Sequence, residues 1–279
     1  MELNNEKAKL TPRVRLGNRM RRLRERRGLS LRQLSEQVGG YSHSYLGRVE
    51  LGEQLPSQAL VDSLDEFFDT DGVLSDLLDL THESLIADYS RAFVSKEPGA
   101  ARLQVFTSSH VPGLLQTEDY ARELFRTALP GERDSSLNER VAVRMRRQRI
   151  LDREEPPYYW AIIDEAALRR PTLVTKKMAG QLRHLLKMAV RPRITIQVLP
   201  FSRGMHPMLG GGLTLMTLAE GTTIALVESF DSGEGVDSTN RVVELTDRFD
   251  LARSMALTDD ESLDLIRRYL KEYEDERDS

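Results

Sequence analysis

The segment Arg27–Pro56 constrains the fold of this chain most, because its residues mark the start and the end of two short helices. Ser30 precedes an apolar run with helical spacing. Gln33, three residues later, completes a capping box, which predicts a helix that begins at Leu31. The pair Gly39–Gly40 ends this helix, because glycine readily adopts the positive φ angles that a sharp reversal of the chain requires.

A second helix is predicted to follow this turn, with Ser42 as its N-cap. Leu46 and Val49 give the helix an inward face, and Gly52 with Pro56 closes it. Two short helices joined by a tight turn form a helix-turn-helix, in which the second helix presents its N-terminal side chains to base edges in the major groove. The pattern therefore predicts a unit that binds double-stranded DNA.

The distribution of charge agrees with this prediction. The net charge is −4, but residues 1–60 hold 12 Lys and Arg against 6 Asp and Glu, so they carry +6 and the remainder carries −10. A basic unit gains affinity for DNA by releasing counterions, whereas an acidic body repels the duplex. No run approaches the ~18 apolar residues of a membrane span, no signal peptide is visible and cysteine is absent, so a cytoplasmic protein is expected.

Several side chains of the basic unit are candidates for contacts with DNA. His43 and Ser44 lie at the exposed start of the second helix, whereas Tyr45 is either a DNA contact or a packing residue. Arg48 either reaches a phosphate or pairs with a nearby carboxylate such as Glu50, and the arginines of a first helix are either phosphate contacts or a solvated face. The predicted DNA-binding set comprises Gln33, Ser42, His43, Ser44, Tyr45, Arg48, Arg19 and Arg32.

The same region resembles the repressor-type helix-turn-helix of the xenobiotic-response-element family, from residue 15 to about residue 68. The leading Leu-Gly, the Arg-Arg-Gly-Leu-Ser joint and the Gly-Glu-x-x-Pro-Ser exit stand at the spacing of that family. The resemblance implies that Gln33 braces a phosphate, while Ser42, His43, Ser44 and Arg48 face DNA. The turn departs from the family pattern, because this chain has two glycines where members usually have one.

The remainder of the chain predicts a mixed α and β body. Strands are expected in YYWAIID, in RITIQVLPF and in a hairpin of LTLMTLA and TIALVES, with helices after Thr117, in ERVAVRMRRQRILDRE, and over Thr175–Val190, Ser238–Ser254 and Asp260–Glu274. The expected fold is an all-α, lambda-repressor-like domain followed by an α+β domain. We place the helix-turn-helix domain at residues 1–70, a helical connector at 71–104 and the α+β domain at 105–279.

The body also resembles a known group of proteins. The motifs VPGLLQTEDYAR, RMRRQRILDRE, DEAALRRP, QVLPFSRGMHP and MALTDDESLDLIRRYLKE occur in the same order as in actinobacterial regulators similar to the WhiJ type. The C-terminal domain of those regulators is described as antitoxin-like. The resemblance implies a small partner protein, encoded by a neighbouring gene, that this domain binds.

Signals for catalysis are thin. The chain has no Gly-rich phosphate loop before a helix, no His-Glu-x-x-His and no nucleophile elbow. His110, His184 and His206 are scattered, without carboxylates at metal-ligand spacing. The pair Asp164–Glu165 is more simply a helix cap than an acid pair, and the loop Gly204–Gly212 either folds over a ligand or connects two elements. We therefore expect no enzymatic activity, no metal and no cofactor.

Three hypotheses about function follow. The first is a transcriptional regulator that binds DNA as a homodimer, because one unit buries too few contacts for operator specificity, and whose body binds a small partner protein or effector. The second is an antitoxin-like protein that sequesters a small partner and regulates its own gene through DNA binding. The third, an enzyme with a DNA-binding domain, lacks a coherent catalytic set.

Overall fold

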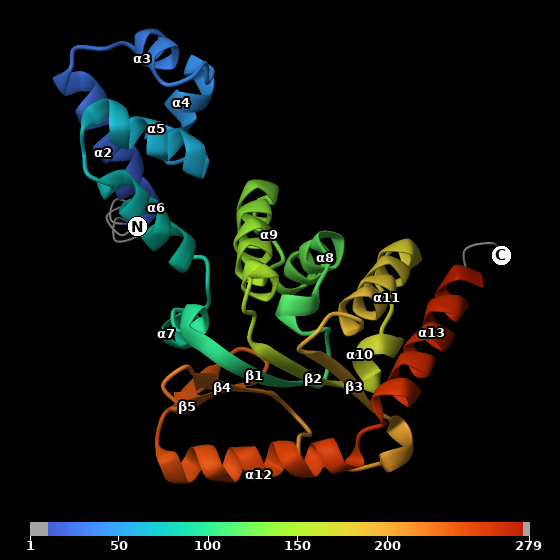
Figure 1. Ribbon diagram of the computed structural model, residues 1–279. Coiled ribbons are helices and arrows are strands. Elements are labelled where there is room, and N and C mark those ends of the chain that lie inside the picture. Colours follow the sequence, from blue (N-terminus) through green and yellow to red (C-terminus); the bar gives the residue numbers. More distant parts are fainter. Residues whose placement is uncertain (1–10, 276–279) are drawn as a thin grey trace, which may run out of the picture. The chain divides into compact units, whose positions relative to one another are not determined.

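A computed structural model describes residues 11–275, which form two compact units that divide between Ala87 and Asp88 (Figure 1). Each unit has its own buried apolar core. The N-terminal unit is all-helical, and the C-terminal unit combines helices with a six-stranded mixed sheet. The fold predicted from the sequence, an all-α domain followed by one with helices and a sheet, is therefore confirmed.

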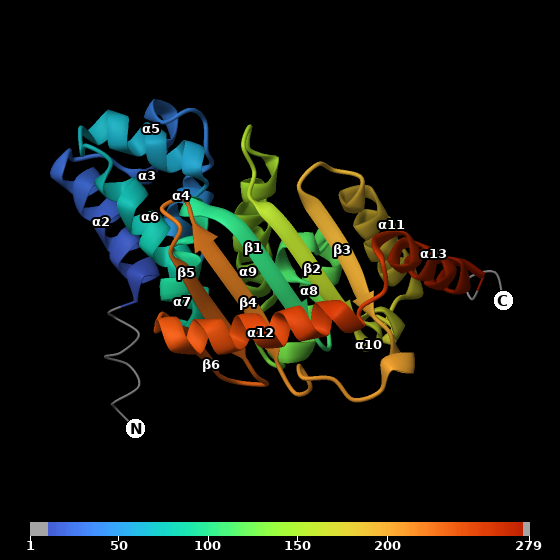
Figure 2. The same cartoon turned by 60° about the horizontal axis from the view of Figure 1, so that its bottom comes forward.

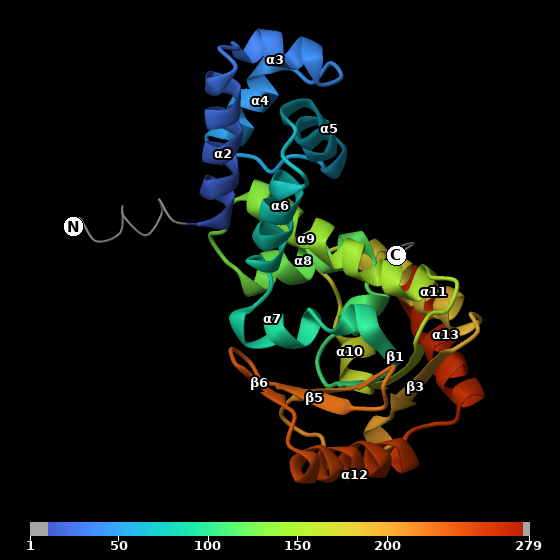
Figure 3. The ribbon, with the colours of Figure 1, turned by 60° about the vertical axis from the view of Figure 1, so that its left-hand side comes forward.

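The N-terminal unit is a helical bundle, and Figure 3 shows α3 and α4 together beside α2. Its described helices are α2 (Pro12–Arg26), α3 (Leu31–Gln37), α4 (His43–Glu50), α5 (Gln58–Phe68) and α6 (Val73–Glu83). Each of the first four begins at a Thr or Ser whose side chain accepts a hydrogen bond from the third residue of the helix. The helix starts predicted at Leu31 and after Ser42 are confirmed.

The start of α6 is capped by a residue of the preceding helix. Gly72 precedes α6 and has no side chain to cap it. Instead, the carboxylate of Asp65 accepts hydrogen bonds from the backbone N–H groups of Leu74 and Ser75, both at 2.9 Å, and from the Thr70 hydroxyl. Burial alone would raise the pKa of Asp65, but these hydrogen bonds outweigh it and the pKa is lowered. Asp65 thus joins α5 to α6 as a carboxylate.

Replacing Asp65 with asparagine is expected to lower the free energy of unfolding of the N-terminal unit by about 1–3 kcal/mol at neutral pH, because backbone donors lose a charged acceptor. Since folding lowers the pKa, the wild-type contribution is complete above the ordinary value of 3.8 and is lost as the pH falls through the folded-state pKa. Chemical unfolding followed by circular dichroism, from neutral pH into acid, measures both effects. The difference between wild type and variant should shrink in acid. A difference that stays constant, or an equal loss in Asp76→Asn at an exposed carboxylate of α6, would contradict the assignment.

The C-terminal unit begins with a short helix and then builds a sheet with helices on both faces. Its strands are β1 (Ala100–Thr107), β2 (Tyr158–Asp164), β3 (Ile194–Leu199), β4 (Gly212–Leu218), β5 (Thr223–Glu228) and β6 (Gly233–Val236). Its α-helices are α7 (Asp88–Val94), α8 (Glu118–Ala128), α9 (Asp134–Gln148), α10 (Glu165–Arg169), α11 (Thr175–Ala189), α12 (Thr239–Met255) and α13 (Asp259–Asp275). Its short 3-10 turns are η1 (Glu97–Gly99), η2 (Gly113–Leu115), η3 (Arg149–Asp152) and η4 (Phe201–Arg203).

The strand order is β3-β2-β1-β4-β5-β6. The first three strands in this order are parallel, while β4, β5 and β6 are joined antiparallel. The parallel strands β2 and β3 therefore end at the same edge of the sheet. The strands expected in YYWAIID and RITIQVLPF, and the hairpin formed by β4 and β5, are confirmed.

Alternate side chains of strands β1 to β5 enter different cores. In β2, Tyr159 and Ala161 pack under the helices α8, α11 and α13, whereas Ile162 packs on the other face with Phe249 of α12. Figures 1 and 2 show α12 lying across that face and the other helices opposite it. Because both faces are covered, β2 and β5 read as nearly continuous apolar runs, whereas β3 and β4 keep an alternation with Thr and Gln.

The segment 71–104 differs from the helical connector that the sequence predicts. Leu74 and Leu78 of α6 are fully buried in the N-terminal core, while Phe93 of α7 packs in the C-terminal core. Residues 100–104 belong to strand β1 and are not helical. The apolar side chains of this segment are thus shared between two cores, which leaves only a short junction between the units.

Candidate nucleic-acid interface

Helix α4 is held rigidly against α2. A Cβ atom at Gly17 would lie only 2.6 Å from the carbonyl oxygens of Val49 and Glu50. Beside this contact, Nε and Nη2 of Arg24 donate to the two carboxylate oxygens of Glu50 at 2.7 and 2.8 Å, and its Nη1 donates to the Leu29 carbonyl at 2.8 Å. The Glu50 side chain is only 5% exposed, so this ion pair is shielded from water.

The turn before α4 is shaped by the residues that the sequence singled out. The Oε1 atom of Gln33 accepts hydrogen bonds from the backbone N–H and the hydroxyl of Ser30, both at 2.8 Å, so the predicted capping box is confirmed. The Gln33 side chain is exposed, and its amide nitrogen makes no hydrogen bond within the described part of the chain. Gly39 and Gly40 both have positive φ angles, 88° and 81°. The reversal therefore needs both glycines.

One face of α4 is open. His43, Ser44 and Arg48 are exposed, and their side chains make no hydrogen bond or ion pair with the other residues that the structure describes. Leu46 and Val49 are buried in the core on the opposite side of the helix. The exposed face thus combines an imidazole, a hydroxyl and a guanidinium, which are groups that hydrogen-bond to base edges and phosphates.

Gly47 positions α4 against α3 and was not singled out in the sequence. A Cβ atom there would lie 3.4 Å from a methyl carbon of Leu31, the first residue of α3. A side chain at this position would approach Leu31 closely, so the glycine lets the two helices lie near one another. The two residues are distant in the sequence, so no local pattern marks this contact.

Besides Gln33, Ser42 and Tyr45 of the predicted set already make structural contacts. Ser42 caps α4, because its hydroxyl accepts from the Tyr45 N–H at 3.2 Å. The Tyr45 hydroxyl donates to the Leu55 carbonyl at 3.3 Å and accepts from the Ser57 N–H at 3.1 Å, and its ring lies 6.0 Å from that of Tyr41. Burial raises the pKa of Tyr45, which keeps this hydroxyl protonated. These contacts favour packing for Tyr45, and its contact with DNA stays a prediction.

Arg48 and Arg32 are exposed cations on the two helices that flank the turn. No carboxylate in the described part of the chain lies within ion-pairing distance of Arg48: Glu50 is bound by Arg24, and Glu53 does not reach it. Arg32 is exposed on α3 and is likewise unpaired. Both are therefore available to phosphates.

Arg19 is placed apart from the other predicted contacts. It belongs to a stripe on α2 whose spacing of four, three and four residues puts Arg15, Arg19, Arg22 and Arg26 on one face. Gly17, which contacts α4, lies on the opposite side of α2 by the same periodicity. The role of Arg19 as a phosphate contact stays a prediction.

The described residues offer few other sites. Within residues 11–275, no group of three or more His, Asp or Glu side chains is arranged to hold a metal ion. None of the helices over these residues has the length and apolar composition that crossing a membrane requires. Asp164 caps α10 by accepting from the Ala166 N–H at 2.8 Å and also contacts His206 at 3.1 Å.

Comparison with known families follows the same division. Residues 15–78 match a family described as a helix-turn-helix domain, which agrees with the geometry of α3 and α4 and indicates a DNA-binding regulator. Residues 90–268 match a family described as a domain of unknown function (DUF5753). This match covers more than half of the sequence, and the chain belongs to the DUF5753 family. Neither the curated proteins nor the solved structures contain a match to this chain.

Proposed function

We propose that this protein is a sequence-specific transcriptional regulator of the xenobiotic-response-element type, and a binding protein rather than an enzyme. The observation that carries the proposal is the open face of α4, where His43, Ser44 and Arg48 lack partners in the described chain while the helix is tied to the bundle. Exposed polar side chains on a rigid second helix are what reading the major groove requires.

We propose that the regulator acts as a homodimer. One α4 offers only a few side chains to base edges, whereas a dimer reads two half-sites about one helical turn apart. The resemblance to WhiJ-type regulators supports assigning the C-terminal unit to a small partner protein or effector. Under the antitoxin-like alternative, the chain would instead co-purify with a small polypeptide at equal stoichiometry. It would then bind DNA only at its own gene.

The test is selection of bound duplexes from a random double-stranded library, followed by fluorescence anisotropy on the enriched sequence. The full-length chain is expected to enrich a palindromic sequence. Two chains are expected to bind each duplex. If the recovered duplexes shared no common sequence and all bound with the same affinity, the proposal would be contradicted.

Replacing both His43 and Ser44 with alanine is expected to reduce discrimination between operator and random duplex by about tenfold or more, because each lost base contact removes roughly 1–3 kcal/mol of specificity. Binding to random duplex should change little. Anisotropy titrations of both duplexes measure the ratio, with Asn18→Ala, an exposed residue of α2, as the control. Equal losses on both duplexes would remove these residues from the recognition set.

Replacing Arg48 with alanine is expected to weaken binding to all sequences and to lower the slope of log K against log salt by about one, because one phosphate contact and its counterion are lost. The slope is obtained from titrations over a range of NaCl concentrations. Arg19→Ala tests the stripe on α2 in the same series. An unchanged slope for either variant would exclude that arginine from the phosphate contacts.

A further inference from the structure

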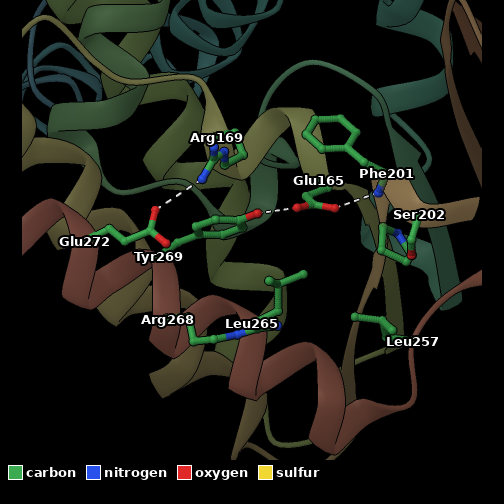
Figure 4. A pocket seen from close by; sticks show the side chains of 10 residues that line it. Glu165, Arg169, Phe201, Ser202, Leu257, Leu265, Arg268, Tyr269 and Glu272 are labelled. Carbon is green, nitrogen blue, oxygen red and sulfur yellow. Dashed lines mark hydrogen bonds and ion pairs between the residues drawn. The ribbon is translucent and has the colours of Figure 1, made fainter. Parts of the chain in front are cut away.

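The C-terminal unit contains a cavity of about 410 Å³ at one edge of its sheet. Glu165 directly follows β2 and Phe201 follows β3, so the cavity lies outside the carboxyl ends of two parallel strands, where open sheets commonly bind ligands. Figure 4 shows Leu265 and Tyr269 of α13 on one side of the space and Leu257 on the other, with Glu165 between Tyr269 and Phe201. The volume is within the roughly 300–1,000 Å³ of small-molecule pockets.

Hydrogen bonds within the protein join the walls of this cavity to one another. Glu165 accepts a hydrogen bond from the Phe201 N–H at 2.6 Å with one oxygen and from the Tyr269 hydroxyl with the other. The start of α13 is joined to β3, because the Ser262 hydroxyl accepts from the Val198 N–H at 2.9 Å. The pocket is thus preformed, which lowers the entropy lost on binding.

The charges in the lining leave one cation without a partner. Both oxygens of Glu165 are occupied, and Glu272 pairs with Arg169 at 3.2 Å. The Arg169 guanidinium also lies 5.2 Å from the centre of the Tyr269 ring. Arg268 lines the cavity, is exposed, and makes no hydrogen bond or ion pair with any other described residue. A ligand therefore meets a free guanidinium in a mixed lining that also presents the apolar side chains of Leu257 and Phe201.

We infer that this cavity binds a small amphipathic monoanion, an aromatic or aliphatic body carrying one carboxylate. The body would pack on Leu257, Leu265 and the exposed ring of Phe201, and the carboxylate would bind Arg268. The carboxylates of Glu165 and Glu272 in the same lining disfavour a multiply charged anion such as a phosphate ester. Naming this ligand as the effector rests on the proposed regulatory function, whereas binding itself does not.

The test is calorimetric titration of the full-length chain, without DNA and at low salt, using indole-3-acetate as the probe. Saturable binding with a Kd of about 1 mM or tighter is expected. Tryptamine, which has the same ring with a cationic chain, and acetate, which lacks the ring, should not bind. Arg268→Gln should weaken binding about tenfold or more. The matched control is Arg267→Gln, whose arginine pairs with Asp264 at 2.7 Å and does not line the cavity.

A second variant, Phe201→Ala, should weaken the binding of indole-3-acetate. It should leave the thermal unfolding temperature unchanged, because the ring is 56% exposed. The inference is overturned if indole-3-acetate does not saturate, if tryptamine binds equally well, or if the Arg268 and Arg267 variants behave alike. Since the titration contains no DNA, such a failure leaves the proposed function standing. Conversely, if the duplex selection enriched no operator while indole-3-acetate still bound, only the proposed function would be contradicted.

Discussion

Replacing Gly17 with alanine is expected to destabilise the N-terminal unit by roughly 3 kcal/mol and to abolish DNA binding at physiological temperature. The new Cβ atom would lie 2.6 Å from two backbone carbonyl oxygens of α4, and neither can rotate away as a side chain would. Helix α2 would have to move off α4, and the burial of Leu16 and Met20 would be disturbed with it. The better helix propensity of alanine, about 1 kcal/mol, offsets only part of this loss.

Chemical unfolding followed by circular dichroism measures the change, and Gly180→Ala supplies a control of opposite sign. Gly180 lies inside α11, and a Cβ there meets no atom within 4 Å, so this substitution should stabilise the C-terminal unit by up to about 1 kcal/mol. If the Gly17 variant were as stable as wild type, the close contact between α2 and α4 would be wrong.

Replacing Glu50 with glutamine is expected to cost about 3 kcal/mol, because it leaves the largely buried Arg24 guanidinium with only the exposed carboxylate of Glu25, 3.8 Å away, as a counter-ion. The Arg24 contact to the Leu29 carbonyl would not compensate, since a neutral oxygen at 2.8 Å stabilises the cation less than a bidentate carboxylate. Loss of the tie between α2 and α4 should also reduce operator affinity.

A double-mutant cycle with Arg24→Met and Glu50→Met separates the ion pair from the packing around it. Apolar replacement of both partners is often close to neutral, so the double variant should recover most of the stability lost in each single variant. Unfolding free energies of the four proteins give the coupling energy. Additive losses in the double variant would mean that the pair contributes nothing specific.

The parts predicted well from the sequence are those that depend on local patterns. The caps Ser30 and Ser42 and the paired glycines at the turn are read from residues within three or four positions, and the structure has the helices where these predict. The strands β2 and β3 were recognised because apolar and β-branched residues dominate them. Strand β6 was missed because its sequence, GEGV, has no strand signal of its own.

Contacts between distant residues could not be predicted. Arg24 and Glu50 are 26 positions apart, and nothing near either residue marks the other as its partner. The hydrogen bonds of the Tyr45 hydroxyl depend on how the loop after α4 folds back. The cavity joins Glu165 to Tyr269 across 104 positions, through a sheet order that sequence alone leaves open. Pairing between remote segments is thus the limit of local reasoning here.

The open face of α4 also bears on how proteins of this design diverge. The exposed side chains of His43, Ser44 and Arg48 contribute no buried contact. The contact between α2 and α4 depends instead on Gly17, Arg24 and Glu50. If these three positions read the operator as we propose, mutations there would alter the preferred operator with little loss of stability. After gene duplication, copies of such a chain would be free to acquire new target genes while the scaffold stays under purifying selection.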